Sequence, residues 1–195
     1  MNTYPTEWAV CQVGWYRGSV EKLSSLGREL SVSGDMTVPE IIVRRAGLRD
    51  VDDLLPLWEE MMRFHAALDP RLEVGSEGAS YMRGVFREWL RSEDCRVLVA
   101  EAEGQIVGYI VGRVADNPPI FRLRTYGHIS DICVSPEWRR QGVGRRLYRA
   151  LREWFKEEGL SVVQLSAAHR NPTSLAFWRA MGFEEYLHHM WSEIR

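Results

Sequence analysis

The stretch "WRRQGVGRRL", residues 138–147, constrains the fold of this chain more than any other part of its sequence. Two glycines, Gly142 and Gly144, stand one residue apart among arginines. A run rich in β-branched residues precedes them, and an amphipathic pattern follows. Glycine is placed where a chain turns tightly or where another group approaches the backbone closely. A strand, a glycine turn and a helix in this order predict an α/β fold whose helix start binds an anion.

The spacing of apolar residues predicts the elements around this turn. Asp50 is positioned to cap a helix that Pro56 should kink or delay, and Asn171 followed by Pro172 predicts another helix start. The expected strands are 40–46, 96–102, 105–114, 126–134, 161–167 and 183–191. The expected helices run from Asp50 to about Leu68, over 78–91, between Gly144 and Gly159, and from Pro172 to Gly182.

Length and composition indicate one domain with an appendage. A chain of 195 residues that is 45% apolar can bury one sizeable core. Residues 1–35 mix scattered tryptophans with Gly and Ser and end in turn-forming residues, so we expect an N-terminal extension of uncertain role. Residues 36–195, which lead directly into the first strand, are expected to form the folded domain.

The charge balance and the cysteines exclude several classes of protein. A net charge of -2 argues against a general nucleic-acid binder, whose balance is usually strongly basic. Cys11, Cys95 and Cys133 have no zinc spacing, and their odd number fits a reducing cytoplasm. No apolar run reaches the roughly 18 residues of a membrane span, and no signal-peptide pattern opens the chain. We therefore expect a cytoplasmic protein without metal, nucleic-acid or membrane partners.

Two ordered motifs carry a resemblance to a known family. The glycine turn lacks the Lys-Ser/Thr pair of a Walker loop and the GxGxxG spacing of a dinucleotide site. The pattern Arg139-x-x-Gly142-x-Gly144 instead resembles the acetyl-CoA pyrophosphate loop of the GNAT superfamily of N-acetyltransferases. The later stretch "NPTSLAFWRAMGF" resembles the second signature of that superfamily. Over residues 40–190 the resemblance implies a GNAT-like α/β fold. That fold is a central mixed, mostly antiparallel sheet with a splayed parallel strand pair, here 126–134 and 161–167, flanked by helices.

The resemblance also implies acetyl-CoA as co-substrate. Its pantetheine arm would lie along the end of strand 126–134, and backbone amides of the glycine turn would hold its pyrophosphate. Trp178 occupies the position where many relatives have Tyr. We expect it to pack beside the arm, because an indole donates a hydrogen bond but is not a practical acid. The expected cofactor-binding residues are Ile132, Cys133, Val134, Arg139, Arg140, Gln141, Gly142, Val143, Gly144, Arg145, Asn171 and Trp178.

The implied reaction is direct transfer of an acetyl group from acetyl-CoA to a primary amine of a small molecule or peptide, in a ternary complex. An alkylamine with a pKa near 10.4 is almost wholly protonated at neutral pH, so a proton acceptor is needed. His128 is the expected base and Asp131 the alternative, while the N–H of Val134 is expected to stabilise the oxyanion. Strand alternation is expected to place His128, Ser130, Ile132 and Val134 on one face and Ile129, Asp131 and Cys133 on the other.

Acceptor specificity is expected in the loop between the first two helices and in residues 115–125. Asp69, Glu73 and Glu77 would suit a cationic amine. The alternative function is an acyl-CoA-binding regulatory module without turnover, for which Trp178 is the argument. A homodimer is the assembly we would test first.

Overall fold

The computed structural model describes residues 40–194, so the predicted extension, residues 1–35, lies outside the described residues. The strands are β1 (Ile42–Arg45), β2 (Cys95–Ala102), β3 (Gln105–Asp116), β4 (Thr125–Val134) and β5 (Val163–Leu165). The α-helices are α1 (Val51–Leu68), α2 (Gly78–Arg91), α3 (Val143–Glu157) and α4 (Pro172–Ala180). Three single 3₁₀ turns complete the described chain: η1 (Leu48–Asp50), η2 (Pro70–Leu72) and η3 (Pro136–Trp138).

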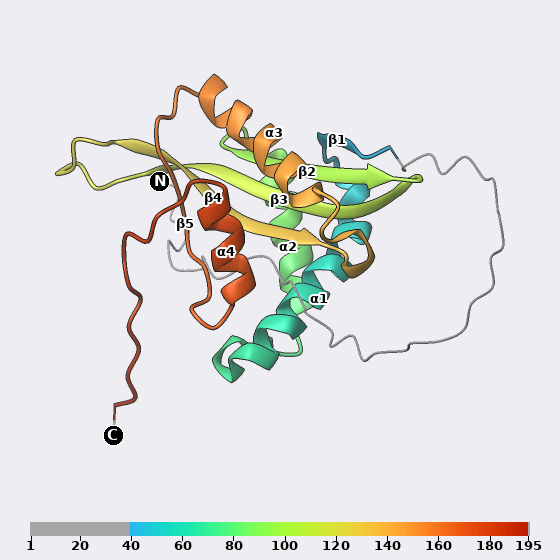
Figure 1. Cartoon of the computed structure of the whole chain (residues 1–195), viewed down its shortest axis with the longest axis horizontal. Helices are drawn as coiled ribbons and strands as arrows, with labels where there is room; N and C mark the ends of the chain where they lie inside the picture. The colour runs from blue at the N-terminus through green and yellow to red at the C-terminus, as the bar shows by residue number, and fades with distance from the viewer. Residues whose placement is uncertain (1–39, 195) are drawn as a thin grey trace, which may run out of the picture.

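The strands form one open sheet in the order β1-β2-β3-β4-β5 (Figure 1). The first four strands pair antiparallel with their neighbours, and β4 pairs with β5 in parallel. Only Gly127–Ile129 of β4 pair with Val163–Leu165 of β5. The next five residues of β4 have no partner on that side, although β4 stays paired with β3 on the other. This mixed sheet with a parting parallel pair confirms the predicted fold class.

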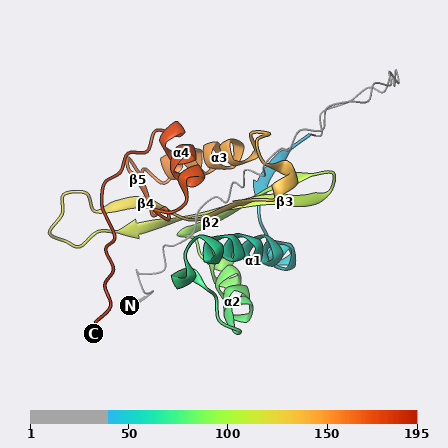
Figure 2. The same cartoon turned by 60° about the horizontal axis from the view of Figure 1, so that its bottom comes forward.

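The helices cover the two faces of the sheet as separate layers. Figure 2 shows α3 and α4 on one face and α1 and α2 on the other. The α3 layer packs closely on the sheet: a Cβ at Gly112 would lie 2.6 Å from Cδ1 of Leu151, so a larger residue there would require the side chains of α3 to shift. One buried cluster joins α3 and Trp178 of α4 to the sheet, and a second joins α1 and α2 to it from the other side.

A bulge in β4 overturns the predicted alternation of its side chains. Val111 is opposite Asp131 and Gly112 is opposite Ile129, so Ser130 is an extra residue in β4. Ile129 therefore joins Ile132 and Val134 in the cluster beneath α3. The expectation that His128 shares a face with Ile132 and Val134 was wrong. His128 precedes Ile129 in a regular ladder and lies on the α1 face with Asp131 and Cys133.

The predicted strand at 183–191 was also wrong, because no strand is assigned beyond α4 in the described residues. Apolar residues there come as adjacent pairs, Tyr186 with Leu187 and Met190 with Trp191, and all four are exposed. Adjacent pairs place one apolar side chain on each side of an extended chain, so neither face can be buried.

Two details of the start of α1 differ from expectation. The carboxylate of Asp50 makes no cap bond to α1. It accepts hydrogen bonds from the Gly47 N–H (2.7 Å) and the Arg44 guanidinium (2.8 and 3.0 Å), tying β1 to the helix start. The pKa of Asp50 is lowered, chiefly by the hydrogen bonds from Arg44. Pro56 does not delay the helix, which starts before it and continues to Leu68.

Candidate functional site

The gap that opens between β4 and β5 is the centre of the candidate site. Within the described residues, β4 has no strand partner on its β5 side after Ile129. Ser135 N–H donates to Val107 of β3 (2.9 Å), and neighbouring residues of an antiparallel ladder turn their backbone groups to opposite edges. The N–H and C=O of Ile132 and Val134 therefore point away from β3, into the gap.

The glycine turn closes one end of this gap. Gly142 has a φ of 83°, in the left-handed region, and a Cβ there would meet nothing within 4 Å, so the turn is open to a ligand. Val143 and Gly144 begin α3, whose first backbone N–H groups have no helical partners and carry the positive end of the helix dipole. Backbone N–H groups presented in this way form an anion site.

The side chain of Arg139 has a structural use that the sequence did not indicate. Its Nε donates to the Val134 carbonyl (2.8 Å) and its Nη2 pairs with Glu60 of α1 (2.7 Å). The pair crosses from the end of β4 to the opposite helix layer, and the Arg139 side chain is 11% exposed. Arg139 therefore fixes the end of β4, and only its backbone remains for a ligand.

Arg140, Gln141 and Arg145 are exposed, whereas Val143 is buried in the cluster beneath α3. Gln141 Nε2 donates to the Glu137 carbonyl (2.8 Å), and Arg140 has a positive φ of 66°. Arg145 lies with two further arginines of α3 along a shallow hollow of about 220 Å³ between α3 and α4. The hollow is lined by Arg145, Tyr148, Arg149, Arg152, Ala180 and Met181. It gives the region beside the turn a strongly positive charge.

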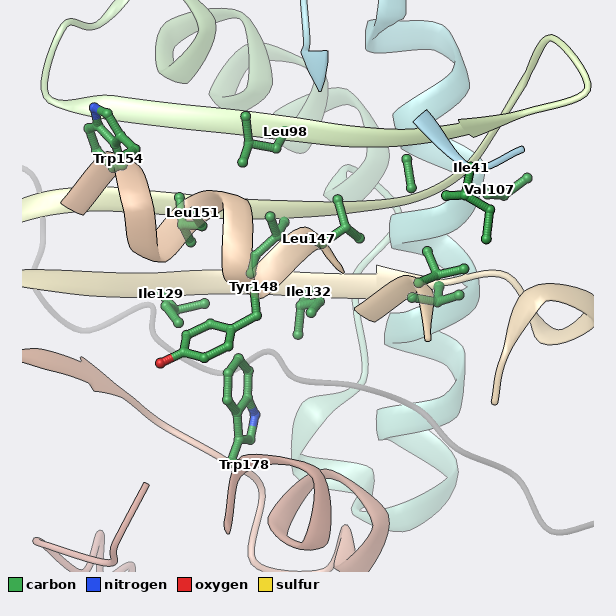
Figure 3. Packing of buried hydrophobic residues seen from close by; sticks show 14 of the residues in the cluster. Ile41, Leu98, Val107, Ile129, Ile132, Leu147, Tyr148, Leu151, Trp154 and Trp178 are labelled. Atoms are coloured by element: carbon green, nitrogen blue, oxygen red, sulfur yellow. The ribbon is translucent and has the colours of Figure 1, made fainter. Parts of the chain in front are cut away.

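Helix α4 lies beside the gap, next to β4. Asn171 caps it, because its Oδ1 accepts the N–H of Ser174 (3.0 Å). Trp178 is 2% exposed, and its ring meets Tyr148 edge-on at a centroid distance of 5.6 Å. Figure 3 shows Trp178 rising from α4 toward β4, with Ile132 close by on the strand. A Cβ at Gly144 would lie 3.5 Å from Phe177 and 3.8 Å from Ile132, so α3, α4 and β4 meet here.

The expected proton acceptors lie on the opposite face of the sheet. Asp131 is buried, and the Tyr109 hydroxyl lies 3.4 Å from its Oδ2. His128 is 8% exposed, and burial together with the charge of Arg113 lowers its pKa to about 4. This lowered pKa favours the neutral imidazole near pH 7, whereas the sequence led us to expect a titration near neutrality. The structure brings His128 and Asp131 to one face, separate from the side chains of Ile132 and Val134.

Two other expected site residues have partners elsewhere. Cys133 is buried on the α1 face, where its Sγ contacts the Leu57 carbonyl at 3.3 Å, and its backbone faces β3. The Asp69 carboxylate pairs with Arg71 and accepts its backbone N–H, so its charge is already compensated. Glu73 and Glu77 remain exposed in the same loop.

The described residues fit an elongated anionic ligand that carries amide groups. A free strand edge suits amides, and the open turn with its helix start suits a diphosphate. Within residues 40–194, no group of three His, Cys, Asp or Glu side chains is arranged to hold a metal ion. No helix of that part of the chain is long and apolar enough to cross a membrane.

Comparison with known proteins agrees with this geometry. Residues 57–183 match the model of the Acetyltransferase (GNAT) family. An N-alpha-acetyltransferase of Sulfurisphaera tokodaii is 27% identical over 151 residues, covering 75% of this chain and 81% of that protein. N-acetyltransferase family 8 member 3 of Mus musculus is 29% identical over 104 residues, covering 53% of this chain and 45% of that protein. The match thus spans about half the length of the mouse relative.

A solved structure shares the fold. The aminoglycoside N-acetyltransferase AAC(6')-Iy, in complex with CoA, has a TM-score of 0.65 at 18% identity, covering 82% of this chain and 98% of that one. The family model extends from α1 to the end of α4 and includes the glycine turn and both parting strands. The chain belongs to the GNAT acetyltransferase family.

Proposed function

We propose that this protein is an N-acetyltransferase that moves an acetyl group from acetyl-CoA to a primary amine. The observation that carries the proposal is the edge of β4 that has no β5 partner. There the N–H and C=O of Ile132 and the N–H of Val134 face the gap, and the edge leads directly to the open glycine turn at the start of α3. The edge of β4 suits the amides of such a ligand, and the glycine turn suits its pyrophosphate. Acetyl-CoA supplies the acetyl group when it is bound there.

The proposed roles on the ligand side follow from the backbone. Ile132 and Val134 bind the pantetheine arm as a neighbouring strand would, and the Val134 N–H faces the reacting carbonyl. The amides from Arg139 to Arg145 hold the pyrophosphate, and the arginines beside the hollow add positive charge. Asn171 caps α4, the helix that borders the gap.

We propose that the acceptor amine approaches from the α1 face, where Asp131 and His128 lie. The amine must lose a proton as the carbon–nitrogen bond forms and the carbon–sulfur bond breaks, with CoA leaving as the thiol. Asp131 is favoured as the group that receives the proton, directly or through a water. It lies beyond the β4–β5 pairing, at the opening of the gap, whereas His128 is opposite Gln164 of β5.

The acceptor belongs to the class of primary amines of small molecules or peptides, and transfer is direct within a ternary complex. The names of the relatives indicate different amines, since one is an N-alpha-acetyltransferase and another an aminoglycoside N-acetyltransferase. Both kinds carry a cationic nitrogen, which a buried carboxylate such as Asp131 attracts.

The experiment that tests this function is acetyl transfer with the full chain. The protein is incubated with acetyl-CoA and a panel of peptides, aminoglycosides and polyamines, and free thiol release is followed together with mass analysis of the acceptor. We expect thiol release that depends on one amine class and an acetylated product. Tight acetyl-CoA binding without transfer to any amine would contradict it.

That outcome would support the second candidate, an acyl-CoA-binding regulatory module. Trp178 favours this candidate, because it places an indole where the GNAT resemblance implies a tyrosine hydroxyl in many relatives. In both cases we propose that residues 36–195 form the working domain of a cytoplasmic protein, and sedimentation of the full chain tests the expected homodimer.

A further inference from the structure

The segment that follows α4, residues 184–194, exposes much apolar surface. Five large apolar side chains are each at least 63% exposed: Tyr186, Leu187, Met190, Trp191 and Ile194. Figure 1 and Figure 2 show the segment 184–194 leaving α4 as an extended chain that runs away from the sheet. Monomeric proteins rarely leave so many neighbouring apolar side chains in water. The segment 184–194 is therefore a surface that another protein covers.

A hollow of matching character lies beside the outer edge of the sheet. β5 is the last strand in the sheet order, and within residues 40–194 no strand pairs with its outer edge. Beside it is a hollow of about 440 Å³, the β5 hollow, with Arg152 and Lys156 among its lining residues. Its apolar lining consists of Tyr148, Phe155, Leu160, Val163, Met181 and Phe183. A strand edge next to an apolar hollow with a basic border suits an extended segment that is apolar and acidic.

The segment 184–194 has this composition. It contains the five exposed apolar residues and three glutamates, Glu184, Glu185 and Glu193, but no Lys or Arg. Its charge is thus opposite to that of Arg152 and Lys156 at the β5 hollow. Opposite charges across an interface favour the matching partner over others.

The segment 184–194 is not built to enter the β5 hollow of its own chain. Gly182 and Phe183 line that hollow, so the residues after them start at its wall and would have to reverse direction to fill it. Turns favour Gly, Pro, Asn, Asp and Ser, and residues 184–191 contain none of these. The Arg71 guanidinium lies 5.0 Å from the ring centroid of Trp191 but leaves this side chain 63% exposed. A second copy can receive the segment without any turn.

We propose that two copies of this chain exchange their segments 184–194. Each segment lies along the outer edge of β5 in the other copy and places one side chain of each adjacent apolar pair in the β5 hollow. Main-chain hydrogen bonds to the strand edge add affinity. The exchange is reciprocal, so one two-fold axis covers both segments and both edges. This inference goes beyond the proposed function, because it uses neither the β4 edge nor the glycine turn.

The surface involved is large enough for a stable dimer. An aromatic side chain buries about 150–250 Å². At their present exposure, Tyr186 and Trp191 of two copies account for about 400–700 Å². The other three apolar side chains of each segment and the receiving surfaces bring the total into the range of about 1,200–2,000 Å² that stable interfaces bury.

Sedimentation of the full chain tests the exchange. We expect the parent to be a dimer at micromolar concentration. Leu187→Asp combined with Met190→Asp should raise the dimer Kd at least a hundredfold, because each copy loses two covered apolar side chains. Ser161→Trp, which fills the β5 hollow from an exposed position of its lining, should do the same. Ile120→Asp is the matched control, since Ile120 is 85% exposed but lies between β3 and β4, and its replacement should leave the dimer intact.

Mixing the two defective variants distinguishes exchange from other arrangements. The double variant keeps an intact β5 hollow, and Ser161→Trp keeps an intact segment 184–194, so a mixed dimer forms one of the two contacts. With one variant labelled, we expect mixed dimers whose Kd lies between that of the parent and that of either variant alone. A monomeric parent, a dimer that survives both changes, or variants that stay monomeric when mixed would each overturn the inference. None of these outcomes bears on acetyl transfer, so the proposed function is tested separately.

Discussion

The two faces of the sheet use polar groups in opposite ways. On the α3 side, the groups assigned to the ligand are backbone amides of the glycine turn and of the adjoining edge of β4, and the side chains there are mostly apolar. On the α1 face, the polar groups are side chains, Asp131 and His128, buried beside Tyr109 and Cys133. A backbone site requires only the right local conformation, whereas a side-chain site requires every residue on the correct face.

This contrast assigns separate tasks to the two faces. Under the proposed function, the α3 face binds acetyl-CoA, which is the same ligand in every turnover, and the α1 face serves proton transfer and acceptor choice. Substitutions on the α3 face should therefore change acetyl-CoA binding. Substitutions on the α1 face should change turnover without changing acetyl-CoA binding.

The largest effect is expected from Asp131→Asn. Turnover with the best amine should fall about a hundredfold or more, because a neutral amide cannot accept the proton that a general base receives. Affinity for acetyl-CoA should stay unchanged, since the Asp131 side chain lies on the α1 face. Steady-state kinetics and calorimetry measure the two quantities. Tyr109→Phe, which removes only the neighbouring hydroxyl, is the control. Loss of acetyl-CoA affinity in Asp131→Asn would break the division between the faces.

The second largest effect is expected from Gly142→Val. Acetyl-CoA binding should weaken about a hundredfold, because a branched side chain strains a residue with positive φ and covers the amides of the turn. Gly159→Val is the matched control. Gly159 also has a positive φ, 74°, and open space around it, but it lies at the other end of α3. Both variants should lose similar stability. Equal loss of affinity in the two would show that strain, and not the anion site, causes the effect.

His128→Gln should change how stability depends on pH. The folded protein keeps His128 neutral down to its pKa of about 4, while the unfolded chain takes up the proton near 6.5. Between these values the unfolded state binds more protons, so stability falls as the pH falls, by about 3 kcal/mol for this group. Denaturant unfolding at pH 4.5 and pH 7 should show a smaller difference in the variant. An unchanged difference would mean that His128 is charged in the fold.

The smallest effect is expected from a chain shortened to begin at Met36. β1 starts at Ile42 and both motifs lie further along, so acetyl-CoA affinity should equal that of the full chain. Calorimetry on both chains measures this. A shortened chain that is insoluble or does not bind would show that residues 1–35 belong to the domain.

The sequence alone determined the features that depend on neighbouring residues. The bounds of α2, the cap of α4 by Asn171 and the turn at Gly142 all follow the prediction. Each depends on a local conformational preference, on a cap bond to a residue three positions away, or on the alternation of apolar residues. The positions of β2, β3 and β4 followed from the same patterns, and the parallel pair of β4 and β5 followed from the resemblance.

Only the tertiary structure decided the arrangement of the polar groups. One extra residue at Ser130 moved His128 to the other face, because strand alternation reverses with each inserted residue. The pair of Glu60 and Arg139 joins residues 79 positions apart. The segment 183–191 found no strand partner. Burial and pairing are properties of the packed chain, and no local pattern encodes them.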